Sequence, residues 1–423
     1  MSSPLRGATG AAPVHGGPAE DGPVRWVVVA DSPFLPAQGG GEREHLGFVE
    51  SAVAAGRVAA LVVPTDDDPA SQGRTDDLEA IRRLVAPAPV LTVPRRRGAG
   101  AFVTRRPYVV ASRPTPPGLA DQLRQVAPDA DAVVVFSYKS AGLGEDLARG
   151  LGLPAVLRQH NLEGPYHQAL ADSARGPRRW VLRWEAWRID RDERRLERAS
   201  WLTGIADISA ADARVRRSRS RVPVAHVPSF ALGTSGATPK PRWRPPAEPV
   251  VVFLGALDVA TNHDALTWFA GQIWPTVRAA VPGVRWQVVG RKPTPAVRAL
   301  VAATPGAELH ADVADPVAYL RQASLAVNPA VSGSGVNIKL VEYLSVGVPV
   351  VSTTRGMAGL GLDPGQDLLV ADDPQPFAKA VVDLLASAEL AARVGGAGHA
   401  TAGRLLDVST SLASLTRLLA PAR

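Results

Sequence analysis

A loop rich in glycine and serine, at residues 331–335, has the composition of a phosphate-binding turn. The apolar run 324–329 before it predicts a strand, and a helical pattern begins just after it, near Ile338. Such a strand-to-helix junction presents free backbone N–H groups and the positive end of the helix dipole, and both favour a phosphate. Gly333 and Gly335 would let the backbone approach a ligand closely.

The helix after this loop is predicted to carry a lysine and a glutamate on the side away from the core. Lys339 and Glu342 lie one turn apart, and Gly347 followed by Pro349 ends the helix. Its core-facing side is formed by Ile338, Val341 and Leu344. These residues alone are also compatible with an ordinary strand–helix turn, in which Lys339 and Glu342 form a surface pair worth about 0.2–0.5 kcal/mol.

The same stretch resembles the donor-binding segment of retaining GT-B glycosyltransferases of group 1, the family-four type. That family carries two glutamates eight positions apart and then a Gly-x-Pro-Val-Val strand, and Glu342 with the run 347–351 matches the second half of this pattern. The resemblance implies that Glu342 binds the ribose hydroxyls of a nucleotide. The first glutamate lies by the hexose in that family, and its position here is Ser334. The loop residues implied to bind the donor are Ser334, Gly335, Val336 and Asn337.

The runs 252–255, 262–266 and 288–291 also resemble this family. The likeness spans roughly residues 245–390 and continues more weakly over 24–230. The resemblance implies further donor contacts from Gly255, Gly290 and Arg291. The fold that it implies is GT-B, in which two Rossmann-like domains with doubly wound parallel sheets face a cleft.

The diphosphate clamp of that family is missing from this chain. Many members place an arginine and a lysine after the first strand of the second domain, where this sequence has Ala256 and Asn262. The cations left for a diphosphate are Lys339, Arg291 and Lys292. Lys339 is predicted to be catalytic, stabilising the leaving diphosphate, because it shares a helix with Glu342.

The first half of the chain opens with a strand, a glycine loop, a helix and a strand, at 24–30, 31–41, 42–55 and 58–63. This order is typical of a mononucleotide fold, and it places Gly39, Gly40 and Gly41 at a helix N-terminus. By resemblance the loop lies across the cleft from the donor, near the diphosphate and the acceptor. The alternative is a surface turn.

Two clusters of polar residues follow predicted strands in this half. His160 comes directly after the strand 154–159, and the carboxyl ends of parallel strands line the ligand crevice of α/β folds. By resemblance His160 contacts the transferred sugar and is predicted to be catalytic, although a helix-capping or packing role is the alternative. The acidic run 66–68 leads into a loop and is interpreted as solvated charge rather than a metal site.

A strongly helical, arginine-rich segment covers residues 175–200. Trp180, Trp184 and Trp187 fall at i, i+4 and i+7, and therefore on one face. One interpretation packs these tryptophans onto the sheet. The other lays them into a membrane surface, with the surrounding arginines on anionic head groups.

The composition describes a protein of two ordinary domains, with 423 residues, 46% hydrophobic and 21% charged. No apolar run reaches the ~18 residues of a transmembrane helix. The absence of cysteine excludes disulfides and thiol catalysis, and fits a cytoplasmic protein. The net charge of +7 favours anionic partners, but no aromatic and basic platform for nucleic acid is present.

The predicted organisation is a disordered leader at 1–22, an acceptor-side domain at 23–231, a proline-rich linker at 232–249, a donor domain at 250–400 and a C-terminal helix at 401–423 that packs back on the first domain.

The predicted function is transfer of a sugar from a nucleoside-diphosphate sugar to a sugar or lipid-linked acceptor, as in cell-surface polysaccharide or glycolipid synthesis. By resemblance, transfer retains configuration and needs neither metal nor cofactor. The predicted location is the cytoplasm, at the inner face of the plasma membrane. The alternatives are an inactive nucleotide-binding scaffold and a sugar-nucleotide epimerase.

Overall fold

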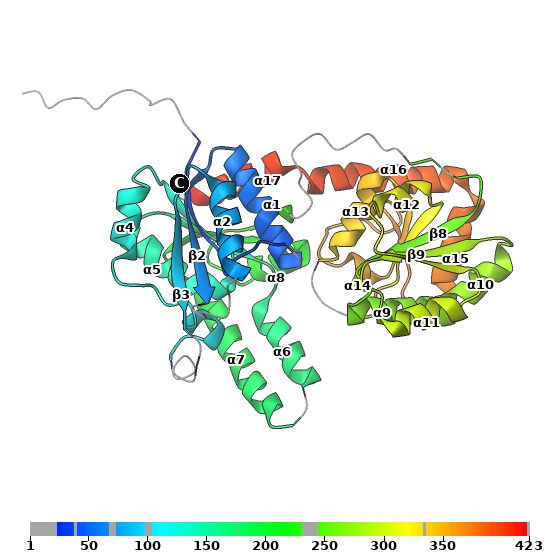
Figure 1. Cartoon of the computed structure of the whole chain (residues 1–423), viewed down its shortest axis with the longest axis horizontal. Helices are drawn as coiled ribbons and strands as arrows, with labels where there is room; N and C mark the ends of the chain where they lie inside the picture. The colour runs from blue at the N-terminus through cyan, green and yellow to red at the C-terminus, as the bar shows by residue number, and fades with distance from the viewer. Residues whose placement is uncertain are drawn as a thin grey trace, which may run out of the picture.

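The computed structural model describes residues 23–37, 40–66, 73–96, 98, 104–174, 176–230, 243–244, 246–332 and 336–420. They form two α/β domains, each built on its own parallel sheet with helices on both faces (Figure 1). The predicted pair of doubly wound parallel sheets is therefore confirmed. The predicted leader and most of the predicted linker lie outside the described residues.

The N-terminal sheet has seven strands in the order β3-β2-β1-β4-β5-β6-β7, all parallel. Its strands are β1 Trp26–Val29, β2 Val58–Asp66, β3 Val90–Arg95, β4 Ala132–Val135, β5 Ala155–Gln159, β6 Leu202–Asp207 and β7 Val224–His226. Its helices are α1 Gly40–Ala54, α2 Gly73–Val85, α3 Tyr108–Ala111, α4 Leu119–Val126, α5 Ala141–Leu151, α6 Glu163–Ser173, α7 Arg178–Leu196 and α8 Ala210–Arg217, with a 3-10 turn at Tyr138–Ser140. The central strands are continuous apolar runs because helices cover both faces of the sheet.

The C-terminal sheet has six parallel strands in the order β10-β9-β8-β11-β12-β13. Its strands are β8 Val250–Leu254, β9 Arg285–Gly290, β10 Ala307–Ala311, β11 Leu325–Asn328, β12 Val350–Ser352 and β13 Leu369–Val370. Its helices are α9 Ala260–Trp268, α10 Trp274–Ala280, α11 Pro295–Ala303, α12 Val317–Gln322, α13 Ile338–Val346, α14 Thr354–Met357, α15 Pro374–Ala386 and α16 Ala388–Leu405, and a π-helical segment, Phe269–Ile273, joins α9 to α10.

The last helix, α17 (Val408–Leu419), leaves the C-terminal domain and packs against the N-terminal sheet (Figure 1). Leu412, Leu415 and Leu419 are buried in the core around β1 and β2. The approach is close, because a Cβ added at Gly204 in β6 would lie 2.7 Å from Leu418 Cβ. Burial of this helix in the first domain ties the two halves of the molecule together.

Two details differ from the sequence predictions. Neither Thr261 nor Asn262, the residues whose side chains could cap the helix that follows β8, does so, because α9 begins at Ala260 and its N-cap is Val259. Asn262 instead uses its side chain for contacts inside the domain. Strand β3 and helix α16 were not predicted, because Pro94 lies inside the strand and three glycines, at 395, 396 and 398, lie inside the helix.

Candidate functional site

Helix α13 is fixed to the sheet by a buried tyrosine. The hydroxyl of Tyr343 donates to the carbonyl of Leu254 at 2.6 Å and accepts from the Leu254 N–H at 2.9 Å, at the carboxyl end of β8. Gly347 ends the helix in the left-handed conformation, at φ 83°. This anchoring places Lys339 and Glu342, one turn apart, at the edge of the sheet where parallel α/β folds bind ligands.

Lys339 does not pair with Glu342. Its ammonium donates to Asn262 Oδ1 at 2.6 Å and lies 4.6 Å from the centre of the Phe253 ring. Burial lowers the pKa of Lys339 to about 8. The surface ion pair that the sequence left open as an alternative is therefore wrong, and Lys339 is instead a partly desolvated cation whose remaining donors can serve a ligand.

Glu342 is half-buried on the same side of α13. Burial raises the pKa of its carboxyl above the ordinary value, and the guanidinium of Arg43 counteracts part of that rise. Arg43 belongs to α1 of the N-terminal domain, so Glu342 lies within electrostatic range of the other domain.

The loop before α13 is described only in part. Ser334 and Gly335 lie outside the described residues. Val336 lines a cavity shared with the N-terminal domain. Asn337 precedes α13 and donates from Nδ2 to Asn328 Oδ1 at 3.5 Å.

Gly255 and Gly290 meet where β8 and β9 end. A Cβ added at Gly290 would lie only 1.8 Å from the Gly255 carbonyl oxygen, and the Leu257 N–H donates to the Arg291 carbonyl at 2.9 Å. The two glycines thus let adjoining loops touch, and this packing explains them without any ligand. The Arg291 side chain is exposed.

Replacing Gly290 with alanine is expected to destabilise the C-terminal domain by about 1–3 kcal/mol or more, because the new methyl group overlaps backbone. Urea unfolding would measure the change in free energy. Gly396→Ala is the matched control, since a Cβ there meets nothing within 4 Å. Equal stability of the Gly290 and Gly396 variants would contradict the packing role.

A cavity of about 460 Å³ joins the N-terminal glycine loop to the second domain. It is lined by Gly41, His160 and Val336, among other residues. Gly41 is also the partner of His45, whose Nδ1 lies 3.0 Å from the Gly41 carbonyl oxygen. Gly40 begins α1, and Gly39 lies outside the described residues.

His160 follows β5 and faces this cavity. Burial lowers its pKa to about 4, so the ring is neutral at pH 7. Its Nε2 is buried and has no hydrogen-bond partner among the residues that the structure describes. Next to it, Glu44 accepts from Arg158 Nε at 2.9 Å. A neutral imidazole with a spare nitrogen can bind a sugar hydroxyl.

Two further charged groups line the cavity and were not singled out in the sequence. Lys139 Nζ lies 3.1 Å from Asp31 Oδ2, and Glu163 stands at the start of α6. Burial, together with the nearby Glu193, raises the pKa of Glu163 to about 7. Lys139 follows a strand just as His160 does, so its position after β4 was the available signal.

The tryptophans of α7 do not pack onto the sheet. Trp180, Trp184 and Trp187 are 70%, 48% and 57% exposed. The interpretation that buried them is therefore wrong. The buried side of α7 carries Glu185, Arg188 and Glu193, which form ion pairs inside the domain.

Residues 248–387 match the model of a protein family described as group 1 glycosyl transferases. The second domain is therefore similar to group 1 glycosyltransferases over about a third of the chain. An uncharacterised 44.6 kDa protein in the cps region of Klebsiella pneumoniae is 25% identical over 141 residues, which are 31% of this chain and 36% of that protein. The match thus spans about a third of the length of this curated relative.

Solved structures support a GT-B fold over 93% of the chain. Anabaena HepE in complex with UDP and glucose has a TM-score of 0.58 at 14% identity, over 93% of this chain and 98% of that one. A variant of S. aureus TarM with fondaparinux, α-GlcNAc-glycerol and UDP has a TM-score of 0.60 at 10% identity, over 93% and 99%. The predicted GT-B fold is confirmed, as is the resemblance of the second domain to group 1 glycosyltransferases.

Among the helices that the structure describes, none combines the length and the apolar character of a membrane span. Nor do three His, Cys, Asp or Glu side chains gather anywhere in the described part of the chain as a set of metal ligands. Asp66 of the acidic run ends β2 and pairs with Arg95 at 3.4 Å, while the other two aspartates lie outside the description.

Proposed function

We propose that this protein transfers a sugar from a nucleoside-diphosphate sugar to an acceptor, with retention of configuration and without a metal ion. The observation that carries the proposal is the placement of Lys339 and Glu342. They lie one turn apart on a helix anchored at the carboxyl end of β8, and Glu342 lies within electrostatic range of Arg43 of the other domain. A carboxylate and a desolvated cation at this spacing suit the ribose and the diphosphate of one nucleotide.

Lys339 takes over the work of the missing diphosphate clamp in this proposal. Asn262 stands where many group 1 enzymes have a lysine, and its Oδ1 accepts from the Lys339 ammonium at 2.6 Å. The ammonium of Lys339, supplied by α13, thus lies beside the position where many group 1 enzymes have a lysine. Held in a low-dielectric site, the ammonium would stabilise the negative charge that develops on the leaving diphosphate.

The acceptor side of the reaction is proposed to be the cavity lined by His160, Lys139 and Glu163. The neutral His160 ring would hydrogen-bond the transferred sugar, and the Glu163 carboxyl would accept from an acceptor hydroxyl. Closure of the two domains would exclude water and limit hydrolysis of the donor. The acceptor is proposed to be a sugar or a lipid-linked sugar at the inner face of the plasma membrane, in cell-surface polysaccharide or glycolipid synthesis.

Calorimetric titration of UDP, GDP and ADP tests the nucleotide site. UDP is the first choice, because the HepE and TarM structures contain it. Glu342→Ala is expected to weaken binding about tenfold or more, or roughly 1.4 kcal/mol. Glu389→Ala, an exposed glutamate at the start of α16, is the matched control and should bind like the wild type. If no nucleotide binds to the wild type, the proposal fails.

A second candidate is an inactive nucleotide-binding scaffold on the same fold. Ser334 in place of the family glutamate and the absence of the diphosphate clamp favour it. Incubation with the sugars of whichever nucleotide binds separates the two candidates. Transfer to an acceptor, or slow release of free sugar, supports the enzyme, whereas tight binding with neither reaction supports the scaffold.

A further inference from the structure

One face of α7 changes from tryptophan to arginine along its length. Its residues recur at alternating intervals of four and three, which is the spacing of a single helical stripe. In order they are Trp180, Trp184, Trp187, Arg191, Arg194 and Arg198, the last just past the end of the helix. The stripe is therefore apolar near the α6–α7 turn and cationic near the sheet.

The apolar half of the stripe is exposed on a projecting part of the molecule. Helices α6 and α7 pack against each other as a hairpin that extends away from the N-terminal sheet (Figure 1). The three tryptophans are about half exposed or more, and Val181 beside them is 53% exposed. Apolar side chains gathered in this way on an exposed surface mark an interaction site.

Arginines accompany each of these tryptophans. The guanidinium carbons of Arg183, Arg188 and Arg191 lie 5.9, 4.5 and 5.6 Å from the ring centres of Trp180, Trp184 and Trp187 respectively. Arg188 also pairs with Glu185 inside the domain, but no carboxylate of the described residues pairs with Arg191. A partner of this face must therefore offer both an apolar region for the aromatic rings and negative charge for the arginines.

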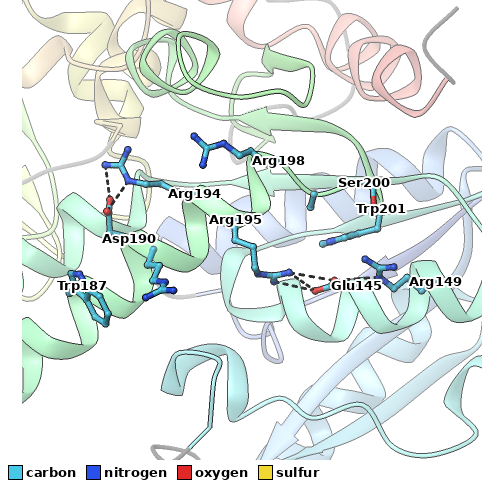
Figure 2. A pocket seen from close by; sticks show the side chains of 11 residues that line it. Glu145, Arg149, Trp187, Asp190, Arg194, Arg195, Arg198, Ser200 and Trp201 are labelled. Atoms are coloured by element: carbon cyan, nitrogen blue, oxygen red, sulfur yellow. Dashed lines mark hydrogen bonds and ion pairs between the residues drawn. The ribbon is translucent and has the colours of Figure 1, made fainter.

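The cationic half of the stripe borders a cavity of about 660 Å³ between α7, α5 and the start of β6. Figure 2 shows Arg194 directed at Asp190, and Arg195 with Arg149 at Glu145, while no dashed line joins Arg198 to either carboxylate. Five arginines and two carboxylates line it, a surplus of three positive charges. No carboxylate in the described part of the chain pairs with Arg198. The cavity has the charge for a phosphate group and is large enough to admit a phosphate-containing head group.

We propose that this face of α7 docks on an anionic lipid bilayer, with the cavity holding a phosphate head group. The tryptophans would enter the boundary between head groups and acyl chains, where an apolar ring with a polar N–H is best accommodated. The arginines would meet the phosphates at the surface. This proposal specifies which surface makes the membrane contact, and its biological purpose rests on the proposed function.

Docking by this face would also orient the acceptor cavity. Helix α6, the other arm of the hairpin, lines that cavity through Glu163 and His167. A hairpin resting on the bilayer therefore brings the acceptor side of the cleft close to the lipid surface. Positive charge and tryptophans along one stripe favour a bilayer over a second copy of this chain, because two such arginine-rich faces would repel each other.

Vesicle flotation with the full chain tests the proposal. Vesicles of phosphatidylcholine alone and vesicles that also contain phosphatidylglycerol are compared, and only the latter are expected to bind strongly. Arg191→Glu with Arg198→Glu should weaken binding to the anionic vesicles at least about tenfold. The matched control is Arg298→Glu with Arg393→Glu, which makes the same charge change at exposed sites of the other domain and should weaken binding much less.

A second set of variants tests the tryptophans. Replacing Trp180, Trp184 and Trp187 with serine should abolish flotation, and brominated lipids should quench the wild-type fluorescence but not that of the variant. The proposal would be overturned if the protein bound neutral and anionic vesicles equally, or if the α7 double variant and its control double variant lost the same amount of vesicle binding. It would also be overturned if the wild type were a dimer that the tryptophan variant dissociates. Flotation needs no nucleotide, so its failure is distinct from failure of the donor site, which calorimetry on the same samples reports.

Discussion

Replacing Lys339 with methionine is expected to lower the rate of sugar transfer about 10²–10³-fold, the usual cost of removing one group that stabilises developing charge. The substitution keeps an apolar stem of similar bulk, but the positive charge disappears, and with it the bond to Asn262 and the ammonium's contact with the Phe253 ring. Nucleotide binding should weaken less than turnover, because the charge on the diphosphate grows as the sugar departs. Steady-state rates with the identified donor measure the effect.

The pH dependence of the reaction offers an independent check on Lys339. Its pKa is lowered to about 8, so the free enzyme loses this charge as pH rises through 8. The value of kcat/KM is therefore expected to fall above about pH 8. Lys339→Arg keeps a charge that does not titrate in this range and should remove the fall. Lys379→Met, at an exposed residue paired with Asp383, is the control and should leave both rate and profile unchanged.

The sequence predicted α13 well because its signals are local. Glycines before the helix, an apolar repeat within it and Gly347 after it define the element without reference to the rest of the chain. The bond from Lys339 to Asn262 spans 77 positions and has no local signal. The helix and its candidate donor-binding residues could thus be proposed from the sequence, whereas the contact of Lys339 with Asn262 in place of Glu342 could not.

On the proposed acceptor side, most of the cavity residues could not be identified from the sequence. His160 was found because it follows a strand, but Lys139 and Glu163 are ordinary charged residues until the fold brings them to one cavity. The pKa of Glu163 depends on Glu193, which lies 30 positions away on α7. Such couplings depend on which helices pack together, and hydrophobic periodicity carries no information about this.

The direction of the tryptophan face of α7 could not be predicted from periodicity alone. Periodicity identified the tryptophan face as the apolar one, and an apolar face normally packs inward. The opposite face is buried in spite of its charges, because Glu185 pairs with Arg188 of the same helix and Glu193 and Glu197 pair with an arginine of α8. Charged residues can be buried when they are paired, so the polarity of a helix face does not by itself determine whether that face is turned to the core or to solvent.

The centre of that buried network is Arg216 of α8, which is fully buried. Its guanidinium donates to Glu193 and Glu197 at 2.9 Å and to Asp207 at 3.1 Å. Glu193 in turn accepts from the backbone N–H groups of Glu163 and Gly164, each at 3.2 Å. The arginine therefore holds together α7, α8, β6 and the first turn of α6, which lines the acceptor cavity.

Arg216→Met is expected to lower the free energy of unfolding by about 3–5 kcal/mol at neutral pH, because three buried carboxylates lose their counter-charge. The loss should be smaller at lower pH. Burial already raises the pKa of Asp207 to about 6, and removing the arginine would raise it further. A folded state that binds more protons than the unfolded chain loses stability as pH rises, so the deficit of the variant should grow between pH 5 and 8.

Urea unfolding of the wild type and the variant at several pH values measures this deficit. Arg214→Met, an exposed arginine on the same helix, is the control and should change stability by less than about 0.5 kcal/mol at any pH. A deficit independent of pH would mean that the lost stability comes from packing rather than from unpaired carboxylates. Because Glu193 positions the start of α6, the folded variant should also need a higher acceptor concentration, while its affinity for nucleotide, set in the other domain, should remain that of the wild type.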